Sequence, residues 1–314
     1  PTDMFDACLN ETTLWNRDGD IFVGEIEDSV DLTQSVFVTR LPVRNISQAK
    51  SFVNRIVAYE KNPLKNGWNN NILLCGCNDL RRTDEPQKSD AQYKSELLYH
   101  THIEPIWDGH LVEFFDTYTD FPEGSSYNVT GYNINEQLSR GYTFFDMDCH
   151  GNQTYWDCED EYYDSVQAAN LFNNCPTVVT TISCLTNAFD TGTEMSLNND
   201  PCLSEALIRN PNSNIVAYLG SSREGLGTNN SSTNLGVSFE YDAKFYELLF
   251  RQSTEWNSFG EIVANVKNSM LSFCSDGAFR WVLFGLNPIG DPEMPIYTSK
   301  PKRLYACSWS YSLG

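Results

Sequence analysis

The chain has 314 residues, of which 42 are acidic and 21 basic, giving a formal net charge of -21 and a sequence pI of about 4.4. This length can bury a full core and form one large domain or two small ones. The acidic balance argues against nucleic acid and anionic membranes as partners, because both are negatively charged. No apolar run is long enough to span a bilayer, so we expect no membrane insertion.

The chain carries ten cysteines. This number suggests an oxidising compartment, although a chain of this length does not need disulfides to fold. With the acidic surface, it predicts a secreted or cell-surface protein. Cys75 and Cys77 share one face of an expected strand, so we do not expect them to bond each other. The sequence assigns no disulfide pairs.

The first polar segment contains a cluster of oxygen ligands. Asn16, Asp18 and Asp20 alternate around Gly19, and Glu25 follows. Alternating oxygen ligands around a glycine turn, closed by a later carboxylate, are what a calcium ion requires. The segment lacks the full EF-hand pattern, so a solvated acidic turn is the competing interpretation.

The next expected elements are a strand over residues 35–39 and a helix over residues 47–59. Ser47 can cap this helix, which carries a continuous apolar stripe. Asn62-Pro63 ends it, because the residue before a proline disfavours helical backbone. A strand over residues 70–77 follows.

A polar loop over residues 78–88 leads to Ser89, which is expected to cap another helix. A strand over residues 112–117 and a short helix over residues 133–139 come next.

Two short apolar strands then end in reactive side chains. The first covers residues 142–149 and precedes His150; the second covers residues 177–183 and precedes Cys184. A helix over residues 165–172 connects them. Parallel strands with a helical crossover end at the same edge of a sheet, where ligand sites lie in α/β folds. We therefore expect His150 and Cys184 to lie close together.

The remaining elements continue the alternation, with helices over residues 202–209, 239–250 and 259–270 and strands over residues 214–220 and 281–286. A Gly- and Ser-rich loop begins at Ser221 and Ser222, on the edge that carries His150 and Cys184. Alternating strands and helices predict an α/β fold with a mostly parallel sheet and helices on both faces.

His150 and Cys184 have the chemistry of a catalytic pair. A cysteine attacks as its thiolate, and a nearby imidazole can serve as base and then as acid to the leaving amine. Gly151 lacks a side chain, so its N–H group can approach a substrate oxyanion. The competing interpretation is that Cys184 is a small apolar filler. Cys149 is a second thiol, which strand alternation points away from the histidine.

In their order, these motifs resemble the caspase-like cysteine peptidases and, within them, the gingipain-like (C25-type) family. The resemblance covers most of the chain and rests on His150-Gly151, Ser183-Cys184, the segment 201–207 and Gly290-Asp291-Pro292. The segments 38–45 and 59–63 resemble the stretch before the family's catalytic subdomain.

The resemblance implies a caspase-like (caspase–hemoglobinase) fold and a secreted cysteine endopeptidase that needs no cofactor for its chemistry. It places the end of a first, non-catalytic subdomain at residues 1–68 and the catalytic subdomain at residues 69–300. Residues 301–314 would be a tail or the start of a following domain. A pro-segment or N-terminal fragment of a longer precursor is an expected partner, besides protein or peptide substrates. Calcium in gingipain-like proteins favours a structural calcium site in the first polar segment.

The resemblance also implies roles for single residues. Cys184 would be the nucleophile and His150 the general base and acid, with the N–H groups of Gly151 and Cys184 forming the oxyanion hole. Asp79 lies where the family places an acid that orients the histidine, although here it is Asp rather than Glu. A solvated loop acid is the other interpretation of Asp79. Ser221 and Ser222 would contact substrate.

Ser89-Asp90 matches a family motif whose aspartate lies at the base of the S1 pocket. A buried carboxylate there would need a cationic partner, and arginine can pair with it bidentately. The resemblance therefore predicts cleavage after Arg, and less so after Lys. Asp90 could instead serve the helix N-terminus, and Arg223 could fill the pocket by pairing with Asp90.

Two other functions stay open from the sequence. An inactive domain of this fold could serve adhesion or assembly. The many acids and aromatics could belong to a glycosidase that works with paired carboxylates.

Overall fold

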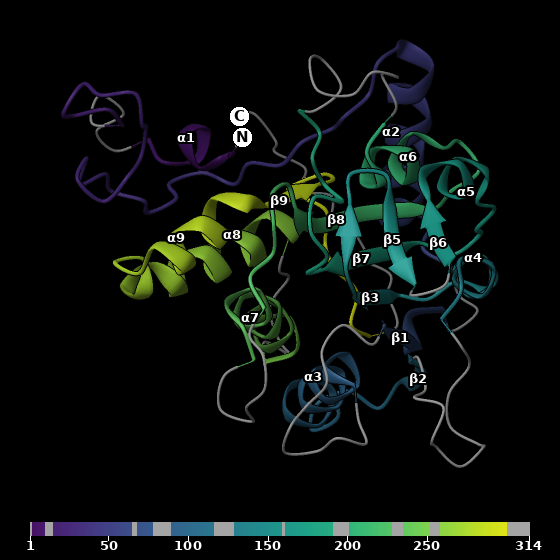
Figure 1. Cartoon of the computed structure of the whole chain (residues 1–314). Helices are drawn as coiled ribbons and strands as arrows, with labels where there is room; N and C mark the ends of the chain where they lie inside the picture. Colours follow the sequence, from purple (N-terminus) through teal and green to yellow (C-terminus); the bar gives the residue numbers. More distant parts are fainter. Residues whose placement is uncertain are drawn as a thin grey trace, which may run out of the picture.

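The computed structural model describes residues 2–9, 15–64, 68–77, 89–115, 129–158, 161–190, 201–227, 235–251 and 258–299. A six-stranded sheet with the order β2-β1-β3-β7-β8-β9 forms its centre (Figure 1). The strands are β1 (Asn71–Gly76), β2 (His110–Phe115), β3 (Phe144–Asp148), β7 (Thr177–Thr181), β8 (Ile215–Ser221) and β9 (Leu286–Ile289). All neighbours pair in parallel except β9, which runs antiparallel to β8.

Helices cover both faces of this sheet, as the alternation of elements predicts (Figure 1). One face carries α2 (Ile46–Lys61), α5 (Ser165–Asn170) and α6 (Leu203–Arg209). The other carries α3 (Asp90–Leu98), α7 (Val237–Arg251), α8 (Phe259–Met270) and α9 (Gly277–Gly285). The fold is therefore α/β with a mostly parallel sheet.

Shorter elements complete the described part of the chain. They are α1 (Met4–Ala7), α4 (Gly131–Arg140), the 3-10 turns η2 (Trp68–Asn70) and η4 (Leu271–Phe273), and the π-helical turn η3 (Tyr99–Ile103). No helix in these described ranges is long and apolar enough to cross a membrane.

A small antiparallel sheet between β3 and α5 was not predicted. It consists of β4 (Gly151–Asn152), β5 (Tyr155–Cys158) and β6 (Glu161–Asp164). The Trp156 ring of β5 is fully buried and lies 5.5 Å from the rings of Phe145 and Tyr163. This sheet fixes the chain that follows the end of β3.

The core is built on strands that are buried on both faces. In β3, Phe144 packs on Phe250 of α7 with ring centroids 5.6 Å apart, whereas Phe145 packs on Trp156 on the opposite face. Burying one such side chain contributes about 1.5–3 kcal/mol. The same strand also carries the buried acids Asp146 and Asp148, which no hydrophobic core requires.

Most expected elements are present with small shifts at their ends. The helix expected over residues 47–59 is α2, but its cap is Asn45 rather than Ser47. The Asn45 side chain accepts a hydrogen bond from the N–H group of Gln48 at 3.0 Å. Ser89 caps α3 as predicted.

Two predicted strands are wrong. Residues 35–39 form no strand, and the segment pairs with the sheet only through a single bridge between Arg40 and Ile289. Residues 281–286 lie almost entirely in α9. The cap of this helix, Asp276, accepts a hydrogen bond from the N–H group of Ala278 at 2.8 Å. The aromatic and β-branched residues of this segment favour a strand, but the cap and tertiary packing override that preference.

The N-terminal segment lies against the last strand of the sheet. The N–H group of Asp3 donates to the Asn287 side chain at 3.3 Å, and that of Arg40 donates to the Pro288 carbonyl at 3.0 Å. The proposed division near residue 68 stays a prediction, and both parts contribute contacts around β9.

Candidate active site

The ends of β3 and β7 bring His150 and Cys184 to one edge of the sheet. These strands are parallel neighbours in a register that pairs Met147 with Thr181. Cys149 and Ser183, which continue both strands at the same separation, are in contact, with Sγ and Oγ 3.2 Å apart. His150 and Cys184 are the next residues along each chain.

The backbone around these residues is closely packed. A Cβ atom built on Gly151 would lie 2.8 Å from the Cys184 carbonyl oxygen and 2.9 Å from the Ser183 Cβ. Only glycine fits there, so the Gly151 main chain lies directly against the proposed nucleophile segment. His150 is exposed and Cys184 half-buried, whereas Cys149 is buried and contacts Ser183. Cys149 is therefore poorly placed as a rival nucleophile.

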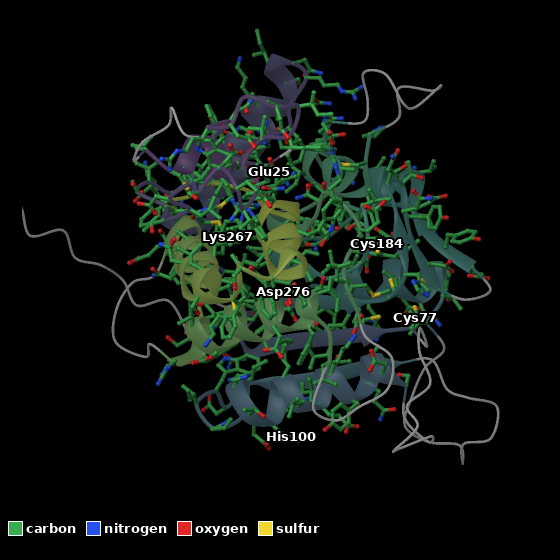
Figure 2. The ribbon with its side chains drawn as sticks, turned by 60° about the vertical axis from the view of Figure 1, so that its left-hand side comes forward. Glu25, Cys77, His100, Cys184, Lys267 and Asp276 are labelled. Carbon is green, nitrogen blue, oxygen red and sulfur yellow. The ribbon has the colours of Figure 1, made fainter. Side chains whose placement is uncertain are left out.

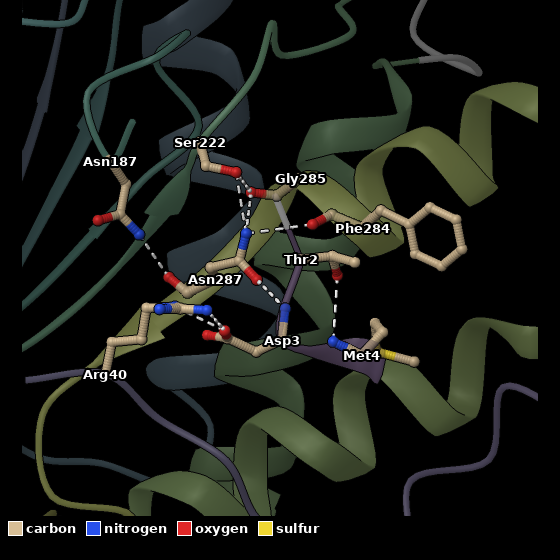
Figure 3. A network of polar contacts seen from close by, with 9 residues as sticks. All are labelled: Thr2, Asp3, Met4, Arg40, Asn187, Ser222, Phe284, Gly285 and Asn287. Carbon is tan, nitrogen blue, oxygen red and sulfur yellow. Dashed lines mark hydrogen bonds and ion pairs between the residues drawn. The ribbon is translucent and has the colours of Figure 1, made fainter. Parts of the chain in front are cut away.

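A sharp turn follows Cys184. Leu185 has a φ of 60°, an uncommon value for a residue with a side chain. Two residues later, Asn187 anchors the turn. Its amide donates to the Asn287 carbonyl at 2.7 Å (Figure 3). The Ser204 hydroxyl donates to the Asn187 side-chain oxygen at 2.7 Å. Sequence reasoning missed Asn187, because its partners are distant in the chain and no local pattern marks it.

Ser221 and Ser222, predicted to contact substrate, are both buried. The Ser222 hydroxyl donates to the Gly285 carbonyl at 3.0 Å and accepts from the Asn287 amide at 2.9 Å (Figure 3). These contacts give Ser222 a scaffolding position beneath the edge, and its hydroxyl does not reach the surface.

The loop after β8 contacts the proposed nucleophile through its main chain. The Gly225 N–H group donates to Cys184 Sγ at 3.2 Å. Arg223 does not pair with Asp90, as the sequence allowed, but forms two hydrogen bonds to Asp190, at 3.1 and 2.7 Å.

Asp90 belongs to a buried charge cluster on the α3 side of the sheet. Lys94 Nζ lies 2.6 Å from Asp90 Oδ2 and 3.2 Å from Asp148 Oδ2. All three side chains are buried. Burial alone would lower the pKa of Lys94, but the charges of Asp148 and Asp90 outweigh it and raise that pKa. Asp90 therefore already has a cationic partner, Lys94, within the folded protein.

Two further acids border this cluster. Burial raises the pKa of Asp146 to about 7, although its hydrogen bond from Thr180 at 2.6 Å opposes the shift. Burial also raises the pKa of Asp242 well above its usual range, and that of Asp148, which Lys94 partly offsets. The face of β3 next to the candidate site thus carries more carboxyl groups than cations.

The cysteines of the described ranges form no disulfide with one another. All nine cysteines in the described ranges are in the thiol form. Of these, Cys175 and Cys184 are half-buried and the others are buried. Hydrogen bonding with Cys149 and Cys158, together with burial, raises the pKa of Cys77.

The candidate calcium ligands converge in the N-terminal segment. Carboxylate oxygens of Asp18, Asp20 and Glu25 lie within 4.8 Å of one another. Desolvation and the charges of Asp20 and Asp18 raise the pKa of Glu25. A bound cation would offset this repulsion between the carboxylates. The Asn16 amide donates to the Asp20 carbonyl at 3.0 Å, which closes the loop. The oxygen-only donor set suits calcium.

This loop is separate from the sheet edge, as the positions of Glu25 and Cys184 in Figure 2 show. Asp79, the predicted orienting acid, lies outside the described residues.

The fold resembles solved peptidases. Gingipain R (RgpB), described as an Arg-specific cysteine proteinase, superposes with a TM-score of 0.68 at 19% identity, covering 87% of this chain and 58% of that chain. A complex of the pro- and mature domains of RgpB from Porphyromonas gingivalis gives 0.65 at 19% identity over 86% and 59%. A structure described only as a protease gives 0.64 at 17% identity over 96% and 60%.

The chain therefore spans about three fifths of the length of these structures. A search of curated proteins finds no match. A family model, in contrast, covers nearly the whole chain: the model of peptidase family C25 matches residues 1–297. The chain belongs to peptidase family C25, and its caspase-like fold is that of the gingipain structures it resembles.

Proposed function

We propose that this protein is an endopeptidase in which Cys184 is the nucleophile and His150 the general base and acid. The observation that carries the proposal is the contact between the ends of β3 and β7, where Gly151 lies against the Cys184 main chain and Cys149 touches Ser183. Family membership supports a thiol mechanism.

In the proposed reaction, His150 takes the proton of the Cys184 thiol, and the sulfur attacks the carbonyl carbon of the peptide bond. N–H groups of Gly151 and Cys184 donate to the oxyanion. The imidazolium then protonates the leaving amine, and a thioester remains. Water that His150 deprotonates hydrolyses the thioester and restores the thiol.

Cleavage of a mixed peptide library by the wild type and by Cys184→Ala tests this assignment. Intact mass after iodoacetamide adds a second readout, because a catalytic thiol is labelled faster than Cys175, which is also half-buried. Slow labelling of Cys184 without any cleavage would identify an inactive domain. Sugar release that survives Cys184→Ala would identify a glycosidase.

We also propose a preference for arginine on the amino side of the cleaved bond, the specificity that the name of gingipain R states for that protein. The buried cluster supports it. Asp90 and Asp148 share the cation Lys94, and Lys94 can stay with Asp148 when a substrate guanidinium binds Asp90. Burial raises the pKa of Asp148 despite the charge of Lys94, so a second cation at the cluster would stabilise its carboxylate form.

Asp90→Ala is expected to lower kcat/KM for arginine substrates at least tenfold, or about 1.4 kcal/mol. The fold should survive, because Lys94 retains Asp148 as its partner at 3.2 Å. The measurement is kcat/KM for matched peptides with Arg or Leu at this position. Efficient cleavage after apolar residues that Asp90→Ala leaves unchanged would show that Asp90 serves only the N-terminus of α3.

A structural calcium ion in the Asp18, Asp20 and Glu25 cluster is a separate proposal. Calcium that binds only the folded state stabilises it by about 2.7 kcal/mol at a hundredfold excess over Kd. Melting should therefore occur at a higher temperature in calcium than in chelator. Glu25→Gln should remove the difference, whereas Glu27→Gln, a neighbouring exposed acid outside the cluster, should keep it. Identical melting curves of the wild type in both conditions would contradict the proposal.

Secretion or surface display, and a pro-segment supplied by a longer precursor, complete the proposed function. The complex between pro- and mature domains of RgpB is a precedent for such a segment in a related fold. Activity measured before and after limited proteolysis of the full precursor tests this part.

A further inference from the structure

Two loops meet at the proposed nucleophile and are joined by main-chain hydrogen bonds. One follows β7 and runs from Cys184 to Asp190; the other follows β8 and begins at Ser222. The Leu185 N–H group donates to the Arg223 carbonyl at 3.1 Å. The Gly225 N–H group reaches back to Cys184 Sγ at 3.2 Å.

Gly225 occupies a position that admits no side chain. A Cβ atom there would lie 2.6 Å from the Ile182 carbonyl oxygen and 3.4 Å from the Ser238 Oγ. The Gly225 N–H group can therefore reach the Cys184 sulfur only while the main chain of this loop keeps its present conformation. A donor aimed at a sulfur favours the thiolate over the thiol, because a hydrogen bond to the charged form stabilises it.

The loop has anchors on both sides of Gly225. On the inner side, the Leu226 N–H group donates to Ser238 Oγ at 2.8 Å. On the outer side, the Arg223 guanidinium donates to both carboxylate oxygens of Asp190, at 3.1 and 2.7 Å. Trp281 adds a hydrogen bond to the Glu224 carbonyl at 2.8 Å.

The Arg223–Asp190 pair is not a strong stabiliser of the fold. The two side chains are 33% and 34% exposed, so solvent screens their attraction. The pair instead restricts the geometry between the two loops. A planar guanidinium bonded at two points holds a more defined orientation than a single charge contact does. It crosses between the two loops at the point where Arg223 also receives the Leu185 hydrogen bond.

We propose that Arg223 and Asp190 are positioning residues that join the two loops and hold the Gly225 N–H group on the Cys184 sulfur. This inference rests on the proposed function, in which Cys184 is the nucleophile. Neither side chain acts on the substrate; the pair acts through Gly225. Loss of the Arg223–Asp190 pair should make the loop more mobile on its outer side. The Gly225 N–H group would then donate to the Cys184 thiolate for only part of the time.

The test measures the rate of Cys184 alkylation by iodoacetamide against pH, together with kcat and KM for peptide cleavage. Asp190→Asn should slow alkylation about tenfold near neutral pH, shift the rate–pH profile upward and lower kcat about tenfold. KM should change less than twofold. Arg223→Lys keeps the positive charge but cannot form the two-point contact with Asp190, so it should give an intermediate effect.

A charge-swapped double variant makes the test specific. Asp190→Arg with Arg223→Asp rebuilds the pair in reverse and should recover most of the alkylation rate that either single change loses. Glu136→Gln is the matched control, since it breaks the exposed Arg140–Glu136 pair on α4, away from the site.

Three results would overturn the proposal: an alkylation profile and kcat within twofold of the wild type in Asp190→Asn, a rise in KM alone, or no recovery in the charge-swapped variant. A rise in KM alone would mean that Asp190 contacts substrate. Failure of the proposed function would look different, because peptide cleavage would then be absent from the wild type or would survive Cys184→Ala, whatever the alkylation profiles show.

Discussion

Cys184→Ala and His150→Ala are each expected to lower kcat/KM for peptide cleavage by at least about 10⁴-fold, because members of a catalytic unit depend on one another. Thermal unfolding should change little. His150 is exposed, and Cys184 is half-buried at the edge of the sheet, so neither truncation opens a cavity in the core. Steady-state cleavage and melting curves of purified variants provide the measurement.

Matched controls separate chemistry from folding. Cys175→Ala removes the other half-buried thiol and should leave cleavage unchanged. His100→Ala removes an exposed histidine paired with Glu104 on the outer side of the molecule, and should also have no effect. Cleavage that persists in Cys184→Ala would refute the assignment of the nucleophile.

The second large effect concerns stability. Lys94→Met is expected to lower the free energy of unfolding by about 3–5 kcal/mol, because it leaves Asp90 and Asp148 buried without their cation. Urea unfolding of the wild type and the variant measures the difference. Lys244→Met is the control: Lys244 pairs with Glu247 at a partly exposed site on α7, and its loss should cost less than about 1 kcal/mol.

The pH dependence of this effect has a defined sign. The pKa of Lys94 is raised in the folded protein by Asp148 and Asp90, against the effect of burial. Its contribution to stability is therefore present below the unfolded value of about 10.4 and is lost as pH rises through the folded pKa. The part of the stability difference between wild type and Lys94→Met that comes from the Lys94 charge should therefore shrink as the pH rises above about 10.4.

A double variant identifies the cause of the destabilisation. Asp90→Asn added to Lys94→Met removes one of the two uncompensated carboxylates and should recover part of the lost free energy. If the double variant is less stable than Lys94→Met by the full cost of a second independent change, the charge argument is wrong and Lys94 acts through packing alone.

The sequence by itself determined the elements that depend on short-range patterns. Short apolar runs joined by a helical segment predicted β3 and β7, and the parallel direction of strands with a helical crossover placed their ends at one edge. That was enough to predict His150 and Cys184 as neighbours. Ser89 was identified as a cap because the signal is a hydroxyl directly before a helix.

Only the tertiary structure decided the features that depend on distant partners. Asn187 and Asn287 are 100 residues apart, and their hydrogen bond follows from the meeting of two loops rather than from either local sequence. The 281–286 segment has the residues of a strand, yet its packing and the Asp276 cap make most of it helix. Local preferences amount to fractions of a kcal/mol per residue, so burial against the rest of the molecule overrides them.

The same limit applies to the charges around the site. Asp90 was predicted to be buried. Its partner Lys94 could not be predicted, because a side chain at the end of a strand and side chains of a helix meet only in the folded protein. Asp148 and Lys94 are 54 positions apart in the sequence and 3.2 Å apart in space. The sequence therefore determined which residues carry the chemistry, and the packing of helices on the sheet determined which charges surround them.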